Sequence, residues 1–315
     1  MGKIAFVFPG QGSQFPGMGK DLYENNKEFR DTFKEADEIL GYKISRICFE
    51  GTREDLDSTD NSQVAIVTFS TALGRLMESL GIESAITAGL SLGEYSALIE
   101  GGALSFRDGL KLVRQRGQFM KKASEKTHGA MAAVLLSDNL DIVQNEIEAL
   151  QEEGIITIAN FNSPGQVVLS GETQLVEKAA EGLKARGIKR IVRLPVSGAF
   201  HTKLMEDAAL NLKEVLCKTD IHSLNESLVS NVTGRILCKE DNLRDILVQH
   251  MVSPVLWQKS VETMIDQGVD TFIELGPGKA LSGFIRKIDR NIKVFNIQDQ
   301  ESLKKTIEEV AYVQR

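Results

Sequence analysis

Residues 89–93 read Gly-Leu-Ser-Leu-Gly, which is the GxSxG spacing of a nucleophile elbow. In an elbow the serine occupies a sharp turn between a strand and a helix, and the two glycines leave room for a close backbone crossing. A helix that begins after Ser91 would favour negative charge developing there, and the backbone N–H of Leu92 would be one oxyanion donor. The pattern therefore predicts an acyl-transfer nucleophile at Ser91. The alternative is a glycine-flanked loop serine.

A nucleophilic serine needs a base, and the chain contains 4 histidines. His201 lies in the loop Pro-Val-Ser-Gly-Ala-Phe-His-Thr, just after a predicted strand at 188–194. Loops at strand ends are where α/β proteins place functional groups, so we predict that His201 is the base. The other histidines lie at the start of a predicted inserted domain, in a polar connection and in a helical stretch: His128, His222 and His250. A structural role for His201 is the alternative.

Two further features could serve acyl chemistry. The glycine-rich loop at 9–14, Pro-Gly-Gln-Gly-Ser-Gln, follows a strand but lacks the spacing of phosphate-binding loops. It could present the backbone N–H of Gln11 to an oxyanion, although a structural turn is the commoner outcome. Arg114 and Arg116 would ordinarily be solvated helical arginines, whereas a buried arginine would be a ready bidentate clamp for a carboxylate.

Composition excludes several classes of protein. The 315 residues, 42% hydrophobic and 26% charged, indicate an ordinary globular protein of about two domains. No apolar stretch approaches the roughly 18 residues that span a bilayer, and the apolar run at 4–8 is no secretory signal. A net charge of −7 disfavours a general binder of nucleic acid or anionic membranes.

The cysteines and histidines favour a reducing compartment without a metal site. Cys48, Cys217 and Cys238 are widely spaced, and no two histidines have the HxH or HxxxH spacing of zinc ligands. We therefore expect three free, buried thiols in a cytoplasmic protein.

The elements that must position these residues form an α/β pattern with an inserted small domain. We expect strands at 3–8 and 85–88 and helices near 20–40, 43–50, 62–80, 92–101 and 106–124, with Ser62 as an N-cap. Residues 128–194 then show the β-α-β-β-α-β order of a ferredoxin-like unit, with strands at 129–136, 155–160, 166–170 and 188–194. Its helices are expected at 138–152 and 173–186, and strands at 227–231 and 271–275 resume the outer alternation. The predicted domains are 1–127 with 195–315, and 128–194.

Seven motifs follow one another along the chain: FPGQGSQ at 8–14, GLSLGEYSAL at 89–98, RQRGQFM at 114–120, GAMAAV at 129–134, NFNSPGQVVLSG at 160–171, AFHTKLM at 199–205 and ELGPGKALSGF at 274–284. With these motifs in this order, essentially the whole chain resembles the malonyl-CoA:acyl carrier protein transacylases of bacterial type II fatty-acid synthesis. The resemblance implies a hydrolase-like α/β core with a ferredoxin-like insert.

The resemblance assigns the reacting groups residue by residue. Ser91 resembles the acylated nucleophile and His201 the base and acid, while the backbone amides of Gln11 and Leu92 match the oxyanion hole. Leu90 departs from the histidine that many members have before the serine, and leucine occurs there in others.

Three further roles follow from the same resemblance. Arg116 matches the arginine that holds the malonyl carboxylate, and Phe200 resembles the residue of malonyl-selective variants. Gln249 resembles the glutamine whose backbone carbonyl orients the histidine. A carbonyl in that place would mean that His201 has no buried aspartate partner.

The implied activity is ping-pong acyl transfer. Ser91 attacks the malonyl thioester while His201 takes its proton, and the carrier protein's phosphopantetheine thiol then attacks the serine ester. Neither a metal nor another cofactor is expected. The expected partners are malonyl-CoA and acyl carrier protein, with no nucleic acid and no membrane, and the family expectation is a monomer.

A basic cluster is the candidate docking surface. Five positive charges fall within ten residues before the His201 loop: Lys184, Arg186, Lys189, Arg190 and Arg193. Since acyl carrier proteins are acidic, we predict docking at Lys189, Arg190 and Arg193. The alternative is a solvated helix end and edge strand.

Three other functions stay open at this point. A serine acyl hydrolase shares the elbow, but it would normally have a buried carboxylate between serine and histidine in chain order and no use for Arg116. A discrete acyltransferase of a polyketide pathway would look almost the same. A catalytically silent carrier-protein-binding module is disfavoured by the joint presence of Ser91, His201 and Arg116.

Overall fold

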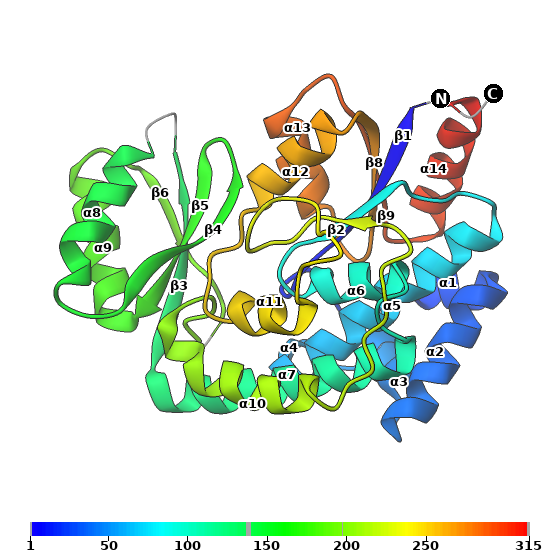
Figure 1. Cartoon of the computed structure of the whole chain (residues 1–315), viewed down its shortest axis with the longest axis horizontal. Helices are drawn as coiled ribbons and strands as arrows, with labels where there is room; N and C mark the ends of the chain where they lie inside the picture. The colour runs from blue at the N-terminus through cyan, green and yellow to red at the C-terminus, as the bar shows by residue number, and fades with distance from the viewer. Residues whose placement is uncertain (1, 137–139, 197, 314–315) are drawn as a thin grey trace.

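The computed structural model describes residues 2–136, 140–196 and 198–313 and contains two separate sheets (Figure 1). The first is a five-stranded parallel sheet in the order β7-β2-β1-β8-β9. Its strands are β1 (Lys3–Phe8), β2 (Ile86–Gly89), β7 (Ser227–Leu228), β8 (Val269–Leu275) and β9 (Lys293–Ile297). This mixed α/β architecture agrees with the class predicted from the sequence.

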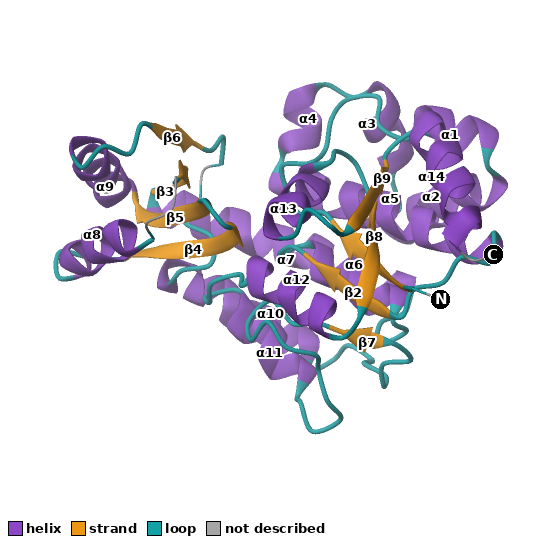
Figure 2. Ribbon diagram, turned by 90° about the horizontal axis from the view of Figure 1, so that it is seen from above, coloured by secondary structure: helices purple, strands orange, loops and turns teal. Residues whose placement is uncertain are grey.

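Helices lie on both faces of the parallel sheet (Figure 2). Those before the second sheet are α1 (Lys20–Asn25), α2 (Lys27–Leu40), α3 (Ile44–Glu50), α4 (Arg53–Asp57), α5 (Thr59–Ser79), α6 (Gly93–Glu100) and α7 (Phe106–Thr127). Those after it are the short 3₁₀ helix η1 (Lys203–Met205), α10 (Glu206–Leu216), α11 (Leu243–His250), α12 (Trp257–Asp266), α13 (Ala280–Ile288) and α14 (Gln300–Val313).

Strand β1 shows why helices cover both faces. Its side chains alternate between two cores because successive residues of a strand point to opposite sides. Phe6 and Phe8 join the large core built with α2, α5 and α7, whereas Ala5 and Val7 join the core built with α12 and α13. Strands that are apolar on both faces are typical of a parallel sheet.

The second sheet is antiparallel, with the order β4-β5-β3-β6. Its elements are β3 (Gly129–Leu135), α8 (Asp141–Gln151), β4 (Ile156–Ser163), β5 (Gln166–Glu172), α9 (Thr173–Ala185) and β6 (Arg190–Arg193), in the predicted β-α-β-β-α-β order. Helices α8 and α9 pack on one face (Figure 1). At β4, Val255 donates a backbone hydrogen bond to Ala159 (2.8 Å) and accepts one from Phe161 (2.9 Å), which links this sheet to the segment after α11.

The structure differs from the sequence-based elements in a few places. The helix expected at 20–40 is two helices, because Asn26 between them has extended backbone (φ −125°). Helix α5 begins at Thr59, so Ser62 is a buried interior residue and not the N-cap. Of the three cysteines, Cys48 is buried as expected, whereas Cys217 and Cys238 are exposed.

No helix among the described residues is long and apolar enough to cross a membrane. No group of three or more histidine, cysteine, aspartate or glutamate side chains in them could hold a metal ion.

Candidate active site

Ser91 lies at the turn between β2 and α6, in the left-handed region of backbone conformation (φ 51°). The flanking positions must be glycine, because the backbone approaches them too closely for a side chain. A Cβ on Gly93 would overlap the carbonyl of Phe8, and a Cβ on Gly89 would overlap the backbone of Gly93. The GxSxG segment therefore has the strand-turn-helix geometry of an elbow, with the serine side chain at the end of a parallel strand.

The side chain of Asn231 brackets this turn. Its Oδ1 accepts a hydrogen bond from the Ser91 amide (2.7 Å), and its Nδ2 donates one to the carbonyl of Gly89 (2.6 Å). Asn231 is fully buried and follows β7, which lies beside β2 in the sheet. Sequence reasoning missed this residue, because the only local signal was its position at the end of a predicted strand.

His201 follows β6 of the second sheet in the chain, and its side chain lies next to Ser91. Its Nε2 lies 2.8 Å from Ser91 Oγ, and the residue is 4% exposed. Its Nδ1 faces two backbone carbonyls, those of His250 (2.9 Å) and Ser253 (3.2 Å). Two acceptors at Nδ1 place the proton there, which leaves the lone pair of Nε2 directed at the serine hydroxyl.

The resemblance assigned the orienting carbonyl to Gln249, and the structure corrects this by one residue. The Gln249 carbonyl accepts from the amides of Met251 and Val252 at the end of α11. The carbonyl of His250, the last residue of the helix, is turned toward His201 instead. The acceptor is still a neutral carbonyl, and no carboxylate within the described ranges contacts the His201 ring.

The environment of His201 keeps it neutral. Burial lowers the pKa of His201 to about 3, and the nearby charges of His250 and Arg116 contribute in the same direction. The hydrogen bonds that Nδ1 donates to the carbonyls of His250 and Ser253 oppose this shift without cancelling it. A neutral imidazole can take a proton, so the resting state is the form that a general base needs.

Two hydroxyl groups hold the backbone beside His201, whose own φ is 62°. Ser170 of β5 donates to the carbonyl of Phe200 (2.7 Å), and Thr202 donates to that of Ala199 (2.7 Å). Phe200 itself is 8% exposed and packs in the large core. The antiparallel sheet thus fixes the loop that carries the base.

Arg116 is the charged group of the site. It is 1% exposed, its Nη2 lies 3.4 Å from Ser91 Oγ, and its Nη1 donates to Gln63 (2.8 Å). Its Nε has no hydrogen-bond partner in the described part of the chain, and no carboxylate there pairs with it. Arg114 points elsewhere, to the carbonyl of Leu40 (3.2 Å), and takes no part in the site.

The candidate oxyanion donors lie around the elbow. Gly10 of the 9–14 loop is so close to it that a Cβ there would stand 2.6 Å from the carbonyl of Leu90. Within the described residues, neither the Gln11 amide nor the Leu92 amide donates a hydrogen bond, whereas the Ser91 amide is occupied by Asn231. The two amides that the sequence singled out are thus the ones left without an acceptor.

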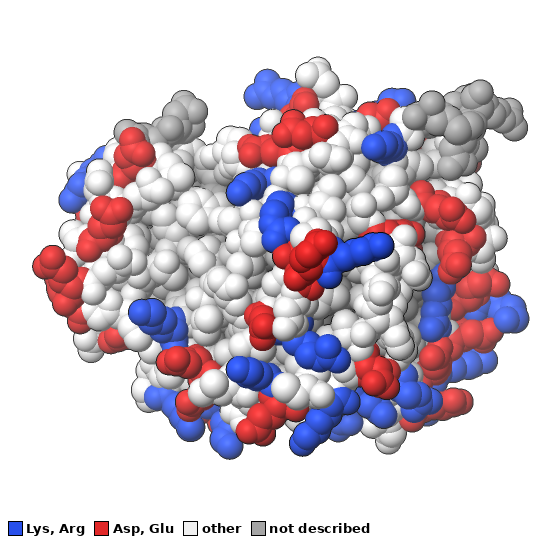
Figure 3. All heavy atoms as spheres, viewed as in Figure 1, with Lys and Arg blue, Asp and Glu red and all other residues white. Residues whose placement is uncertain are grey.

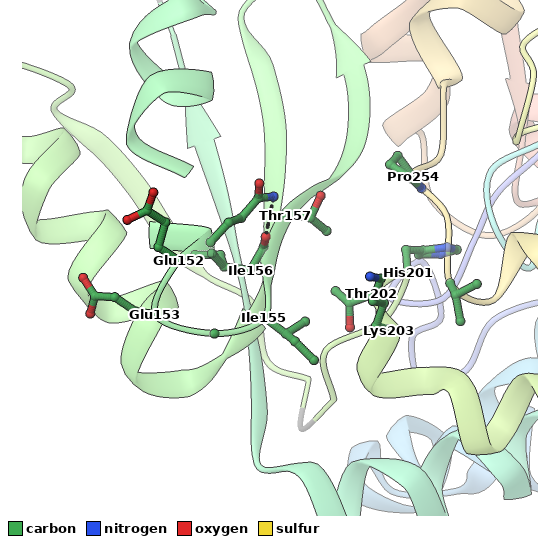
Figure 4. A pocket seen from close by; sticks show the side chains of 12 residues that line it. Glu152, Glu153, Ile155, Ile156, Thr157, His201, Thr202, Lys203 and Pro254 are labelled. Carbon is green, nitrogen blue, oxygen red and sulfur yellow. Dashed lines mark hydrogen bonds between the residues drawn. The ribbon is translucent and has the colours of Figure 1, made fainter. Parts of the chain in front are cut away.

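A cavity of about 650 Å³ opens onto His201 (Figure 4). One wall is residues 151–157, at the end of α8 and the start of β4, and the other is 201–203 with Val252 and Pro254. In Figure 4 the carboxylates of Glu152 and Glu153 lie on the side away from His201. A substrate that reaches the base through this cavity would therefore contact the start of β4 on one side and the loops at 201–203 and 252–254 on the other.

The remaining predicted residues lie away from the reacting atoms. His128 has φ 45° and ends α7, and His222 is exposed. In the basic cluster, Arg193 pairs with Glu177 (2.7 Å) and Arg186 with Glu146 (3.0 Å). Three exposed residues of that cluster form no ion pair within the described ranges: Lys184, Lys189 and Arg190.

The whole chain is similar to known acyl transferases. The family described as acyl transferase domain matches residues 5–308. The chain is 44% identical over 308 residues to the malonyl CoA-acyl carrier protein transacylase of Bacillus subtilis (strain 168), covering 98% of this chain and 97% of that protein. The crystal structure of malonyl CoA-acyl carrier protein transacylase from Clostridium perfringens has a TM-score of 0.95 at 44% identity, covering 99% of this chain and 98% of the other.

A third structure has a partner bound. It is a type II PKS acyl-carrier protein in complex with its malonyl-transacylase, whose chain matches this one with a TM-score of 0.94 at 36% identity. The match covers 98% of this chain and 99% of the other.

Proposed function

The chain belongs to the acyl transferase family, and we propose that Ser91 and His201 are the residues with which it transfers its acyl group. The activity is transfer of a malonyl group from malonyl-CoA to the phosphopantetheine thiol of acyl carrier protein, in fatty-acid biosynthesis. The 2.8 Å contact between the serine hydroxyl and a neutral imidazole supports these two roles.

In the first half-reaction Ser91 Oγ attacks the thioester carbonyl of malonyl-CoA, and its proton passes to His201 Nε2. The amides of Gln11 and Leu92 donate to the oxyanion of the tetrahedral intermediate. When the intermediate collapses, the bond to sulfur breaks and the imidazolium returns the proton to the CoA thiolate. The carbonyls of His250 and Ser253 stabilise the imidazolium while it exists.

The second half-reaction reverses these steps. The carrier protein's thiol gives its proton to His201 and attacks the serine ester, and collapse of the second intermediate returns the proton to Ser91. Protons balance over the cycle, and the thioester bond broken is replaced by one of the same kind. His201 is 4% exposed and Ser91 is half-buried, which limits the access of competing water.

The choice of a malonyl group rests on a buried cation that forms no ion pair with the described residues. Arg116 is 1% exposed, its nearest contact to the nucleophile is 3.4 Å, and it forms no ion pair with a described residue. An unpaired buried charge is costly, so a substrate that supplies a carboxylate next to the reacting carbonyl is favoured. Phe200, beside the base, is proposed to limit the size of the acyl group.

The alternatives are less well supported. A lipase-type hydrolase would present a buried carboxylate to Nδ1 of the base, whereas His201 faces carbonyls. A discrete polyketide-pathway enzyme shares the site, as the complex of the malonyl-transacylase with a type II PKS carrier protein illustrates. The relatives from Bacillus subtilis, Escherichia coli and Clostridium perfringens are named malonyl CoA-acyl carrier protein transacylase with no polyketide pathway in the name, which favours the fatty-acid reading.

We also propose the finer division of the fold. Residues 128–194 form a ferredoxin-like domain, which the β-α-β-β-α-β order and the strand order β4-β5-β3-β6 support. Residues 1–127 and 195–315 form a hydrolase-like domain, supported by the parallel sheet and the elbow after β2.

Carrier-protein docking is proposed at Lys189 and Arg190, with Arg193 contributing less because Glu177 neutralises it. These residues lie on or next to β6, an edge strand whose side chains are mostly exposed. Figure 3 shows both signs of charge dispersed over one face of the molecule and uncharged side chains between the two sheets. Lys189 and Arg190 are exposed and form no ion pair with the described residues, so an acidic carrier protein could meet both charges. The chain is expected to act as a monomer.

The test is incubation with malonyl-CoA labelled in the malonyl group, followed by addition of carrier protein. Label should bind covalently to the wild type, increasing its mass by about 86 Da, and should move to the carrier protein thiol. Ser91→Ala should take up no label, because it lacks the hydroxyl and adds no bulk at the elbow. A labelled Ser91→Ala protein would show that the nucleophile lies elsewhere, and release of free malonate without transfer would favour a hydrolase.

A further inference from the structure

A second buried histidine lies beside the base and has a charged partner. His250 Nδ1 is 2.8 Å from Oε2 of Glu94, and the two side chains are 1% and 2% exposed. The His250 ring centroid is 5.2 Å from that of His201. The mechanism above uses the carbonyl of His250 but neither of these two side chains.

The acidic and the basic partner each lie at the helix end that suits them. Glu94 is in the first turn of α6, directly after the elbow, and His250 is the last residue of α11. Helix dipoles favour acidic groups at the start of a helix and basic groups at its end. The pair therefore connects the start of the helix behind the nucleophile with the end of the helix that supplies a carbonyl to the base.

These contacts close into a ring that begins and ends at Ser91. The backbone N–H of Ser91 donates to Asn231 Oδ1 (2.7 Å), and the backbone N–H of Asn231 donates to Glu94 Oε1 (3.1 Å). Glu94 Oε2 contacts His250, whose carbonyl accepts from His201 Nδ1 (2.9 Å). His201 Nε2 returns to Ser91 Oγ (2.8 Å). Each position in the ring depends on its two neighbours.

We propose that the ion pair of Glu94 and His250 is a positioning device that fixes the His250 carbonyl, and with it the His201 ring, relative to the nucleophile. Neither side chain contacts the reacting atoms. This inference rests on the proposed function, because the ring matters only if Ser91 and His201 react.

A physical need for such a device follows from where the carbonyl lies. The last carbonyls of a helix have no intrahelical partner, and helix ends fray. His201 takes its orientation from two carbonyls at and after the end of α11, so movement there would turn the ring away from Ser91. The ion pair ties that helix end to α6. Glu94 Oε2 has no hydrogen bond in the described structure besides its contact with His250. Removing His250 would therefore leave this buried oxygen without a partner.

Three other ionisable groups face the pair. They are His201, Arg116 of α7 and Tyr95, the neighbour of Glu94 on α6. Of these groups only Arg116 is a cation in the resting site, and the Glu94 carboxylate offsets part of its charge, which lowers the repulsion that the imidazolium of His201 meets during the reaction. Removing either partner would therefore disturb both the position of the base and the charge around it.

The experiment compares four proteins: wild type, Glu94→Gln, His250→Gln and the double variant Glu94→Gln/His250→Gln. The rate of serine acylation is measured in single turnover at saturating malonyl-CoA, together with KM. Each single variant should acylate about tenfold or more slowly, a part of what a positioned base contributes. KM should change little, because Arg116 and the oxyanion donors are untouched. In the double variant two amides can pair again, and the rate should recover to within a few-fold of wild type.

Controls and a second readout separate positioning from loss of fold. Glu309→Gln on α14 and the exposed His222→Gln make the same chemical changes far from the ring and should acylate like wild type. The His201 Nδ1 proton, followed by NMR in histidine-labelled protein, should shift or broaden in the single variants and return in the double variant.

The outcomes are distinguishable. Wild-type acylation rates in both single variants overturn the proposal, as does a double variant whose loss is the product of the two single losses. If the wild type itself is not malonylated, the proposed function fails, whatever the variants do. A single variant that unfolds leaves the double variant and its proton resonance to decide the question.

Discussion

Ser91 and His201 share the left-handed region of backbone conformation, with φ values of 51° and 62°, and their side chains meet at 2.8 Å. Residues other than glycine seldom adopt this region, because the Cβ crowds the backbone. Such strain persists where the surroundings over-determine it. Here Asn231 brackets Ser91, while Ser170 and Thr202 hold the carbonyls before His201. The two reacting residues are thus held in place by three side chains that take no part in the reaction.

The first prediction concerns pH. Burial lowers the pKa of His201 to about 3, so the base stays neutral far below the ordinary histidine value of 6.5. Acylation measured as kcat/KM for malonyl-CoA should therefore show no inflection near pH 6.5 between pH 8 and pH 5. An inflection there that His201→Ala abolishes would show that the base titrates as an exposed histidine. His201→Ala itself should acylate about 10² to 10⁴-fold more slowly.

The same shift predicts how stability depends on pH. The unfolded chain binds a proton at His201 below pH 6.5, whereas the folded chain does so only near pH 3. The unfolding free energy contributed by this residue should therefore fall as the pH decreases from 6.5 toward 3. Denaturant unfolding of wild type and His201→Gln at several pH values measures it. Equal slopes for the two proteins in this window would contradict the shift.

The third prediction concerns selectivity. Arg116→Ala removes the buried guanidinium that would meet the malonyl carboxylate, and malonyl transfer should lose about 3 to 5 kcal/mol, or roughly 10² to 5 × 10³-fold in kcat/KM. Acetyl-CoA has no carboxylate, so its transfer should fall little or should rise. Arg116→Lys should restore malonyl transfer only in part, because a point charge cannot reproduce the planar fork.

Arg114→Ala is the matched control, since Arg114 lies two residues away on α7 and contacts Leu40 instead. It should leave the ratio of malonyl to acetyl transfer unchanged. Parallel decreases for the two thioesters in Arg116→Ala would mean that Arg116 is structural.

The fourth prediction concerns docking. Reversing the charges of Lys189 and Arg190 to glutamate should weaken transfer to carrier protein and leave acylation by malonyl-CoA intact. The effect should shrink at high ionic strength, because exposed charges are screened. Lys304 and Lys305 on α14 are exposed and lie at the opposite end of the molecule, so their reversal makes the same change of charge elsewhere (Figure 1). If the two double reversals change KM for carrier protein equally, the basic cluster is a solvated surface with no specific role in docking.

The fifth prediction concerns a carboxyl group outside the site. Burial raises the pKa of Glu100 to about 7, with contributions from Glu226 and Glu78. The unfolded side chain ionises near 4.5, so stability should be lost as the pH rises from 4.5 through 7. Glu100→Gln should therefore raise the melting temperature at pH 8 and change it little at pH 5. The exposed Glu38→Gln is the control, and a gain that is equal at both pH values would contradict the shift.

The sequence predicted the elements whose signals are local. The elbow is a single short segment in which strand, glycines, serine and helix follow one another, so its type and position were predictable. The order in which the elements of the second sheet follow one another along the chain was predictable for the same reason, since each strand and helix between 129 and 193 has its own pattern. The break at Asn26 and the early start of α5 were not, because element boundaries depend on tertiary contacts.

The partners of the site were beyond the reach of local patterns. Asn231 lies 140 residues from Ser91, and Ser170 lies 30 from Phe200, so each contact exists only in the folded chain. The carbonyl that orients His201 was expected one residue too early, at Gln249. Which carbonyl turns outward depends on where α11 ends, and that is set by packing.

The position of β1 between β2 and β8 has a consequence for how the protein is made. One edge of β1 can pair with β2 early, but the other waits for Val269–Leu275, about 260 residues later. At about 5 to 20 residues per second, a ribosome needs roughly 13 to 50 s to cover that distance. An unpaired, apolar strand edge is a template for aggregation during this interval. The nascent chain must therefore be shielded until its eighth strand emerges, and a chain that stops short of that strand cannot complete the sheet that carries Ser91.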